Sequence, residues 1–550
     1  MLRRKLKYLL WLPALGFLLI VPVGAGDSYF EVSKNLEIFS SLYKELNIYY
    51  VDEMDANKSM RTAIDAMLGD LDPYTNFISE AEMEAFRFQT TGRYGGIGAV
   101  IRAKDGYIGV VEVHEGTPSH KAKLQAGDLI IAVDGRSTEG RSSDDVSKLL
   151  RGTPGTEVEV KVRRKVTGEE FSAKLLREEI SLKNVPYYGM AAEGIGYIRL
   201  EQFTEKSGLH VQEALKDLEK KGKLNGLILD LRGNPGGLLH EAVNVANVFI
   251  PKGKLVVDTK GRVPDWDQKR KTLSDPVDTD IRLVILTDNG SASASEIVAG
   301  VMQDYDRGLV VGRKTFGKGL VQQTRDLSYK TKLKITIAKY YTPSGRCIQA
   351  LDYSHRDANG KAEEVPDSLR RAFKTSNGRT VFDGAGIEPD IKVDPRSYPL
   401  VLASLMSKDL VFDFATEYRY KRQELASAAD FHAGDEVYQE FLDYIKDKDY
   451  SYQTQSEKTI DRLETQSKDE KYYDALSQEI EDLRAQITAD KMNDLARHRD
   501  AIVAALESEI ISRYYMRAGR IEASFDDDPD ITEALALLKN PELYRQLLSP

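Results

Sequence analysis

Four apolar runs in the middle of the chain have the length of buried strands, and amphipathic or small-residue stretches separate them. The runs are residues 196–200, 227–231, 283–286 and 309–312. Helical spacing is found at residues 207–220, in the stretch that ends at residue 248, and in the stretch that begins at residue 295. Strands that alternate with helices in this way predict an α/β core.

The regions before this core have other patterns. Residues 27–90 are polar and amphipathic with helical spacing, and a proline-containing turn at residues 71–75 interrupts them. Residues 91–178 contain glycine-rich turns between β-type runs. We therefore expect a multidomain α/β protein, in which a helical domain (27–90) and a β-rich domain with helices (91–178) precede the core (179–395).

The last part of the chain, residues 396–550, is a long charged extension with helical character. Within it, Leu476, Ile480, Leu483 and Ile487 have the spacing of a short coiled-coil seam. We expect a helical bundle packed on its own core or on the N-terminal helices, and the alternative is a lid, a tether or a dimer arm. The acidic run at residues 526–528 is expected to be a solvated loop and not a metal site.

The first 25 residues are typical of an export signal. A basic segment at residues 3–7 precedes an apolar run at residues 8–23, and small residues allow cleavage after Ala25. The alternative is an uncleaved anchor, although the run is short for a membrane-spanning helix and Pro13 interrupts it. Either reading predicts export to the periplasm or cell envelope, with a tether to the inner membrane in the second case.

Composition excludes several functions. The 550-residue chain has a formal net charge of -10 at pH 7, which argues against a large basic face for nucleic acid. A single cysteine, Cys347, rules out an intrachain disulfide. The seven histidines are scattered, and the sequence has no H-E-x-x-H motif and no cysteine–histidine cluster. We therefore expect neither a metal nor another cofactor.

The strongest candidate chemistry lies in two neighbouring strings. The string D-N-G-S-A-S-A-S-E-I-V-A-G begins at Asp288 and joins an apolar run to a predicted helix. A serine in such a turn presents its hydroxyl beside N–H groups that favour developing negative charge. The string G-R-K-T-F-G-K-G-L-V-Q then places Lys318 between two glycines. Taken alone, Ser293 fits a helix N-cap and Lys318 a solvated charge, but the flanking glycines favour a shaped loop.

Together the two strings resemble the carboxyl-terminal processing, or tail-specific, serine peptidase family. The resemblance implies that Ser293 is the nucleophile, that Lys318 is the general base, and that Gln322 orients the lysine. It also implies a core of the ClpP/crotonase type. A lysine can take the serine proton only when it is neutral at about pH 7. Burial lowers the lysine pKa because it disfavours the charged ammonium.

A third string, D-L-R-G-N-P-G-G-L at residues 230–238, also resembles this family. The resemblance implies that the N–H of Ala294 and the N–H of Gly236 or Gly237 form the oxyanion hole, and the choice between the glycines stays open. The alternative is a strand-to-helix loop without a catalytic role. Residues 340–346 resemble the family as well and are expected to line the substrate side.

His240 raises the alternative of a Ser–His–Asp triad with Asp230. Its place on a predicted helix and the presence of Lys318 favour a surface or packing histidine instead.

Residues 91–178 resemble a PDZ domain. A glycine-rich loop leads into a strand near residue 100, the string A-G-D-L-I-I-A-V-D-G at residues 126–135 matches the PDZ hairpin, and residues 144–150 predict the groove helix. A substrate peptide would add as a strand beside the loop, whose N–H groups would hold its terminal carboxylate. The predicted peptide-binding residues are Tyr94, Gly96, Ile97, Gly98 and Ala99. The alternative is a glycine turn that only closes a small barrel.

The combined patterns predict an exported serine endopeptidase that recognises the C-terminal region of protein substrates through a PDZ domain and cleaves peptide bonds with a Ser293–Lys318 dyad. Protein substrates are the expected partners, nucleic acid is not, and a homodimer through helical segments and a membrane tether are left open. The alternative from another class is a non-catalytic PDZ scaffold of the cell envelope. A decayed site should lack Ser293, Lys318 or Gln322, and the sequence contains all three.

Overall fold

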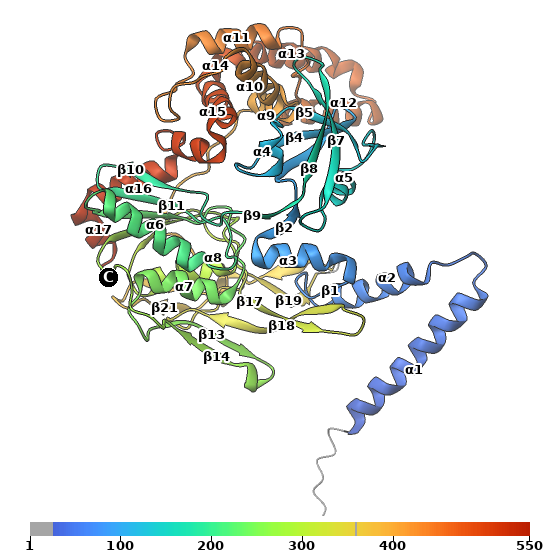
Figure 1. Ribbon diagram of the computed structural model, residues 1–550, viewed down its shortest axis with the longest axis vertical. Helices are drawn as coiled ribbons and strands as arrows, with labels where there is room; N and C mark the ends of the chain where they lie inside the picture. Colours follow the sequence, from blue (N-terminus) through green and yellow to red (C-terminus); the bar gives the residue numbers. More distant parts are fainter. Residues whose placement is uncertain (1–25, 358–359) are drawn as a thin grey trace, which may run out of the picture. The chain divides into compact units, whose positions relative to one another are not determined.

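The computed structural model describes residues 26–357 and 360–550 (Figure 1), so the predicted signal or anchor at residues 1–25 lies outside the described residues. The chain forms two compact units, of which the first ends at Phe77 and the second runs from Ile78 to Pro550. In the described ranges, no helix has the length and hydropathy that a membrane span needs.

The first unit is helical, as its amphipathic spacing predicts. It contains α1 (Gly26–Tyr49) and α2 (Ala56–Gly69), and the short strand β1 (Asn76–Ile78) lies at its end. Asp55 caps α2 by accepting a hydrogen bond from the N–H of Lys58 at 3.0 Å.

The PDZ region follows η1 (Glu80–Glu82) and α3 (Met83–Thr91) in the second unit. Its sheet has the strand order β3-β4-β5-β7-β8, with β6 paired to β5, so β3 is an edge strand. The strands are β3 (Ala99–Lys104), β4 (Tyr107–Val113), β5 (Asp128–Val133), β6 (Arg136–Ser137), β7 (Glu157–Arg164) and β8 (Glu170–Leu176). A separate ribbon pairs β2 (Arg93–Gly96) with β9 (Glu178–Ser181), and the helices are α4 (Pro118–Lys121) and α5 (Ser143–Leu150).

The core contains a six-stranded sheet of order β10-β11-β12-β15-β16-β23. All neighbouring pairs are parallel except β10 with β11. The strands are β10 (Tyr187–Ala192), β11 (Ile195–Arg199), β12 (Gly226–Asp230), β15 (Arg282–Thr287), β16 (Leu309–Gly312) and β23 (Ile391–Lys392). Four of them coincide within a residue or two with the apolar runs of the sequence.

Helices cover both faces of this sheet, which explains why its strands are apolar at nearly every position. One face packs against α6 (Ser207–Lys221), α7 (Leu239–Phe249) and α8 (Ala294–Asp304). The other face packs against α16 (Pro529–Lys539) and α17 (Pro541–Leu547), so the red end of the chain returns to the core in Figure 1. The sequence pattern did not predict that the last helices belong to this sheet.

A second sheet of the core carries the residues after the lysine loop. In it, β17 (Leu320–Asp326) pairs with β18 (Lys332–Tyr341), β18 with β13 (Leu255–Gly261), and β13 with β14 (Gln268–Lys271). The smaller elements of the core are η2 (Pro264–Trp266), β19 (Leu351–Arg356), β20 (Ala362–Glu364), η3 (Asp367–Leu369), β21 (Ala372–Lys374) and β22 (Thr380–Phe382).

A helical bundle with its own apolar core occupies most of the C-terminal region. It contains α9 (Leu400–Ser407), α10 (Leu410–Lys421), α11 (Asp435–Ile445), α12 (Gln455–Asp469), α13 (Tyr473–Lys491), α14 (Asp494–Arg497) and α15 (Arg499–Ala523). The predicted seam is a weak one: among its members, Ile480 is buried, while Leu483 is 45% exposed. Most of the buried core of the bundle comes instead from α9, α10, α11 and α15.

Candidate active site

Ser293 occupies a strained turn between β15 and α8. Its backbone has φ 56° and ψ -108°, a conformation that side chains other than glycine rarely adopt. The residue directly precedes the first helical residue, Ala294, so the first N–H of the helix lies beside the serine. Ser293 itself is half-buried.

A buried carboxylate holds this turn against the lysine loop. Glu296 accepts hydrogen bonds from the N–H of Ser293 at 2.7 Å and from the N–H of Lys318 at 2.9 Å, both at Oε2. Its Oε1 accepts from the hydroxyl of Thr315 at 2.6 Å and from the N–H of Gly317 at 2.7 Å. The sequence pattern did not indicate a role for Glu296, and the signal that could have done so is an acidic residue three positions after the serine.

The protonation of Glu296 is finely balanced. Burial raises the pKa of this carboxyl from 4.5 to about 7, although hydrogen bonds from Thr315, Lys318, Ser293 and Gly317 oppose the shift. The group is therefore an acid whose charge changes near neutral pH inside the candidate site.

Tyr340 provides a second connection between the two loops. Its hydroxyl lies 3.0 Å from the carbonyl oxygen of Ser293 and 2.5 Å from that of Lys318. Because Tyr340 is only 1% exposed, it supports the loops from inside the core. The expectation that residues 340–346 line the substrate side is therefore wrong for Tyr340, which the fold turns inward.

Lys318 itself lies in the loop that Glu296 and Tyr340 contact, and it is half-buried.

Gln322 lies on β17, four residues after Lys318. Its amide Nε2 donates to the Thr336 hydroxyl at 3.2 Å, across a bulge in the pairing of β17 with β18. The bulge changes the register next to Gln322, as bulges near functional sites often do to aim a side chain.

The glycine loop after β12 lies against the serine turn. A Cβ atom on Gly236 would lie 2.8 Å from the nitrogen of Ala294 and 2.9 Å from Cβ of Ser293, so only glycine permits this approach. The N–H of Gly236 donates to Oδ1 of Asn234 at 2.9 Å, and its carbonyl accepts from the N–H of Phe203 at 2.9 Å. Among the described residues, neither the N–H of Gly237 nor that of Ala294 has an acceptor.

His240 and Asp230 do not form a triad with Ser293. The side chain of His240 is 59% exposed on α7. Asp230 is fully buried, and its carboxylate is bound by the Tyr197 hydroxyl at 2.7 Å and by Arg199 at 2.7 Å. The carboxylate that would orient a histidine is thus already engaged elsewhere.

Three of the five predicted peptide-binding residues lie at or directly before the start of the edge strand β3. Gly98 has φ +78°, and its carbonyl accepts from the N–H of His114 at 3.0 Å, while Ile97 is buried in the PDZ core. Ala99 begins β3, which packs beside α5. Tyr94 and Gly96 lie earlier, in β2, where the Tyr94 ring contacts Phe88 and Arg151.

Within residues 29–357 and 360–550, no group of three or more histidine, cysteine, aspartate or glutamate side chains could hold a metal ion.

Three family models match the chain. "Peptidase family S41" matches residues 194–353, which contain the serine turn, the lysine loop and the glycine loop. "PDZ domain" matches residues 109–164, and "Probable PDZ-protease, C-terminal helical domain" matches residues 401–538.

The chain is also similar to individual proteins. The carboxy-terminal-processing protease of Bartonella bacilliformis is 38% identical over 326 residues, which cover 58% of this chain and 73% of that protein. The photosystem II D1 C-terminal processing protease is 28% identical with a TM-score of 0.38, over 68% of this chain and 89% of that one. The PDZ domain of a carboxy-terminal protease from Vibrio cholerae, in complex with peptide, is 29% identical with a TM-score of 0.16, over 16% of this chain and 99% of that domain.

Proposed function

The chain belongs to peptidase family S41, as a C-terminal processing serine peptidase with a PDZ domain, and on this premise we propose that Ser293 and Lys318 form its catalytic dyad. The observation that carries the proposal is the carboxylate of Glu296, which accepts hydrogen bonds from the backbone of both residues. One buried group thereby sets the position of the serine turn relative to the lysine loop, and such preorganisation is what a two-residue mechanism requires.

In the proposed reaction, the Lys318 amine takes the proton of the Ser293 hydroxyl as its oxygen attacks the peptide carbonyl carbon. The tetrahedral intermediate collapses to an ester on Ser293, and the lysine gives the proton to the departing amine. Water then attacks the ester with Lys318 as base, which releases the carboxylate product and restores the serine. Gln322, four residues along β17, is proposed to orient the lysine.

The N–H groups of Ala294 and Gly237 are proposed as the oxyanion hole. The carbonyl of Gly236 points to Phe203, and in a trans peptide the next N–H points the opposite way. The Gly236 N–H is already used by Asn234, whereas Gly237 is exposed. This geometry favours Gly237 over Gly236, a choice that the sequence left open.

Substrate recognition is proposed to occur at the PDZ edge. The strand β3 has one unpaired edge and a glycine-rich turn at its start, which suits a peptide that adds as a strand and places its carboxylate at the N–H groups of residues 97–99. The peptide-bound PDZ domain of the Vibrio cholerae protease supports this mode.

Export is proposed from residues 1–25 alone, with the periplasm or cell envelope as the destination. N-terminal sequencing of the mature protein distinguishes cleavage after Ala25 from a retained anchor, and recovery of the intact chain in the cytoplasm would contradict export. The helical segments leave a homodimer open, which sedimentation would decide.

Cleavage of a peptide that ends in a free carboxylate tests the dyad. We expect Ser293→Ala and Lys318→Ala each to lower kcat by about 10⁴-fold or more, because each removes a member of the reacting pair. His240→Ala is the matched control and should retain full turnover. Equal turnover by wild type and Ser293→Ala would instead favour the non-catalytic PDZ scaffold.

A further inference from the structure

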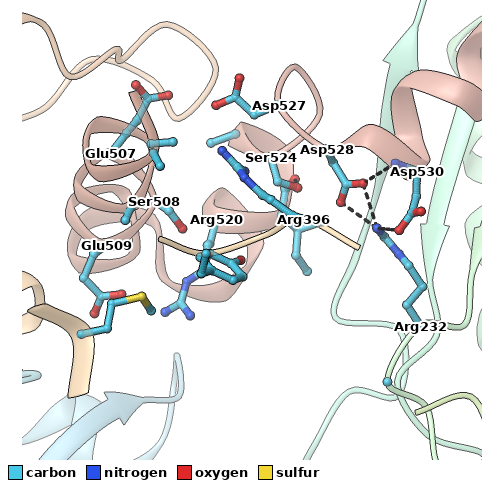
Figure 2. Close-up of a pocket in the computed structure, with 18 of the residues that line it drawn as sticks. Arg232, Arg396, Glu507, Ser508, Glu509, Arg520, Ser524, Asp527, Asp528 and Asp530 are labelled. Carbon is cyan, nitrogen blue, oxygen red and sulfur yellow. Dashed lines mark hydrogen bonds and ion pairs between the residues drawn. The ribbon is translucent and has the colours of Figure 1, made fainter. Parts of the chain in front are cut away.

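The glycine loop is bound by the start of α16, a helix from the end of the chain. Arg232, near the start of this loop, donates to both carboxylate oxygens of Asp528, at 2.8 and 2.7 Å, and to Asp530 at 2.8 Å. Figure 2 shows the Arg232 side chain pointing at these two residues across the edge of the core. The acidic run was expected to be a solvated loop, and for Asp528 that expectation is wrong because the fold brings it to Arg232.

These contacts are well shielded from solvent. The side chain of Arg232 is 13% exposed, that of Asp528 19% and that of Asp530 2%. Arg232 also binds Asp230, the last residue of β12, at 2.6 Å. A guanidinium held by three carboxylates in a protected place has a fixed position, because forked charge-assisted hydrogen bonds are both strong and directional.

Further hydrogen bonds fix the backbone of the glycine loop at Arg232 and the residues after it. The carbonyl of Arg232 accepts from Arg199 at 2.7 Å, and the next N–H, of Gly233, donates to Asp288 at 2.8 Å. Asn234 then accepts from the hydroxyl of Ser295 and the N–H of Ala292, at 2.9 and 3.0 Å. Each step from Asp528 to the serine turn is therefore a direct contact.

A cavity of about 930 Å³ borders the same contact on the side of the helical bundle. Its wall includes Arg232, Asp528 and Asp530 together with Glu507 and Ser508 of α15 (Figure 2). At this wall of the cavity, Asp528 and Asp530 at the start of α16 are the residues that bind Arg232.

We propose that Asp528 and Asp530 are positioning residues, which act through Arg232 to hold the glycine loop in the geometry of the oxyanion hole. The proposal rests on the proposed function and deepens it, since it makes the C-terminal segment part of the catalytic apparatus. Only the fold brings the two segments together, because Arg232 and Asp528 are 296 residues apart in the sequence.

The variant Asp528→Asn tests this role cleanly. Asparagine keeps the oxygen that caps α16, but it replaces the other oxygen with an NH₂ group, so the charge and one acceptor opposite Arg232 are lost. We expect kcat for a tail peptide, and the rate at which a fluorophosphonate labels Ser293, to fall by about tenfold or more with KM within about twofold. Arg232→Lys, which keeps the charge without the fork, should show the same pattern.

A double-mutant cycle separates positioning from general stability. In an Arg232→Met background, Asp528→Asn should cause no further loss, because its route to the loop is gone. Asp435→Asn, which removes a surface partner of Arg499 in the helical bundle, is the matched control and should leave both rates unchanged.

Two outcomes would overturn the proposal. One is an unchanged kcat and labelling rate in Asp528→Asn, and the other is a full additional loss when it is combined with Arg232→Met. If Ser293→Ala retained turnover, the proposed function itself would fail. Complete loss in Ser293→Ala with a fully active Asp528→Asn would reject only the positioning role.

Discussion

At the scale of single residues, the serine turn combines strain with dense hydrogen bonding. The φ of 56° at Ser293 is stabilised by two hydrogen bonds, one from its N–H to Glu296 and one from the Tyr340 hydroxyl to its carbonyl oxygen. Strained backbone of this kind persists only where the surroundings determine it, and it clusters at sites of chemistry.

The strain can be measured by comparing two inactive variants. Ser293→Gly should be more stable to denaturant than Ser293→Ala by about 1 kcal/mol or more, because glycine adopts this backbone without a Cβ penalty. Urea unfolding of both proteins gives the difference. Equal stability, or a more stable alanine variant, would show that the turn is not strained.

Loss of the Glu296 carboxylate should slow turnover strongly, although less than loss of either member of the proposed dyad. Glu296→Gln places an amide NH₂ where one carboxylate oxygen accepted two hydrogen bonds, and in either rotamer at least one backbone N–H loses its acceptor. We expect kcat to fall by about a hundredfold, as for loss of a group that positions reacting atoms. Glu241→Gln is the control, since that buried carboxylate accepts from Lys206 and Gly208 away from the dyad.

The raised pKa of Glu296 also predicts a pH dependence of stability. The folded protein holds this proton more tightly than the unfolded chain, so the contribution is full below about pH 4.5 and is lost as pH rises through about 7. Relative to Glu296→Gln, wild type should lose up to about 3 kcal/mol between these limits. Parallel stability curves for the two proteins would contradict this.

At the scale of elements, α10 of the helical bundle is joined to β3 of the PDZ sheet by buried charges. The Lys104 ammonium lies 2.8 Å from Asp409 and 2.9 Å from Asp413, and its side chain is only 3% exposed. Arg102, on the same face of β3, also pairs with Asp409. The face of β3 that points away from the PDZ core is therefore attached to another domain.

Removing the buried ammonium should loosen this contact. Lys104→Met keeps the length of the side chain but leaves two carboxylates without a shared partner, at a cost of about 3 kcal/mol. Hydrogen exchange in β3 and α10 should then accelerate by about a hundredfold. Lys161→Met, which breaks an exposed pair with Glu170 in the same sheet, should change exchange little. Similar effects of both variants would reject the buried contact as the link.

At the scale of the whole molecule, the last two helices complete the core. Ile531, Ala534, Leu537 and Leu538 of α16 are almost fully buried against the sheet. The hydroxyl of Tyr544, on α17, lies 2.9 Å from both the N–H and the carbonyl oxygen of Leu283 in β15. The strand that leads to Ser293 is thus covered by the end of the chain.

Truncation after Asp528 should therefore abolish the enzyme. It exposes one apolar face of the sheet, for which we expect aggregation and loss of soluble, active protein. Excision of α12 and α13 removes more residues but only Ile460, Ser467 and Ile480 from the interior, and should be tolerated better. Size-exclusion chromatography and peptide cleavage would compare the two, and a soluble, active truncation at Asp528 would refute this view.

The candidate site residues that the sequence itself indicated lie close together in the chain or carry a distinctive string. Ser293 with its turn, Lys318 between glycines and the loop at residues 230–238 are local features, and so are the strands that present them. The spacing of apolar residues identified these strands, because a strand that is buried on one or both faces has apolar residues at the buried positions.

Contacts between distant segments could not be predicted in this way. The sequence indicated that a serine and a lysine belong to one site, but not that Glu296 holds their loops together, that Gly237 has the available N–H, or that Asp528 meets Arg232. An acidic residue has the same local pattern in a solvated loop as in a buried ion pair, and only folding decides which cation it reaches. The chain by itself determined the chemistry of its elements. The tertiary structure decided which carboxylates would be buried and hold the serine turn, the lysine loop and the glycine loop in place.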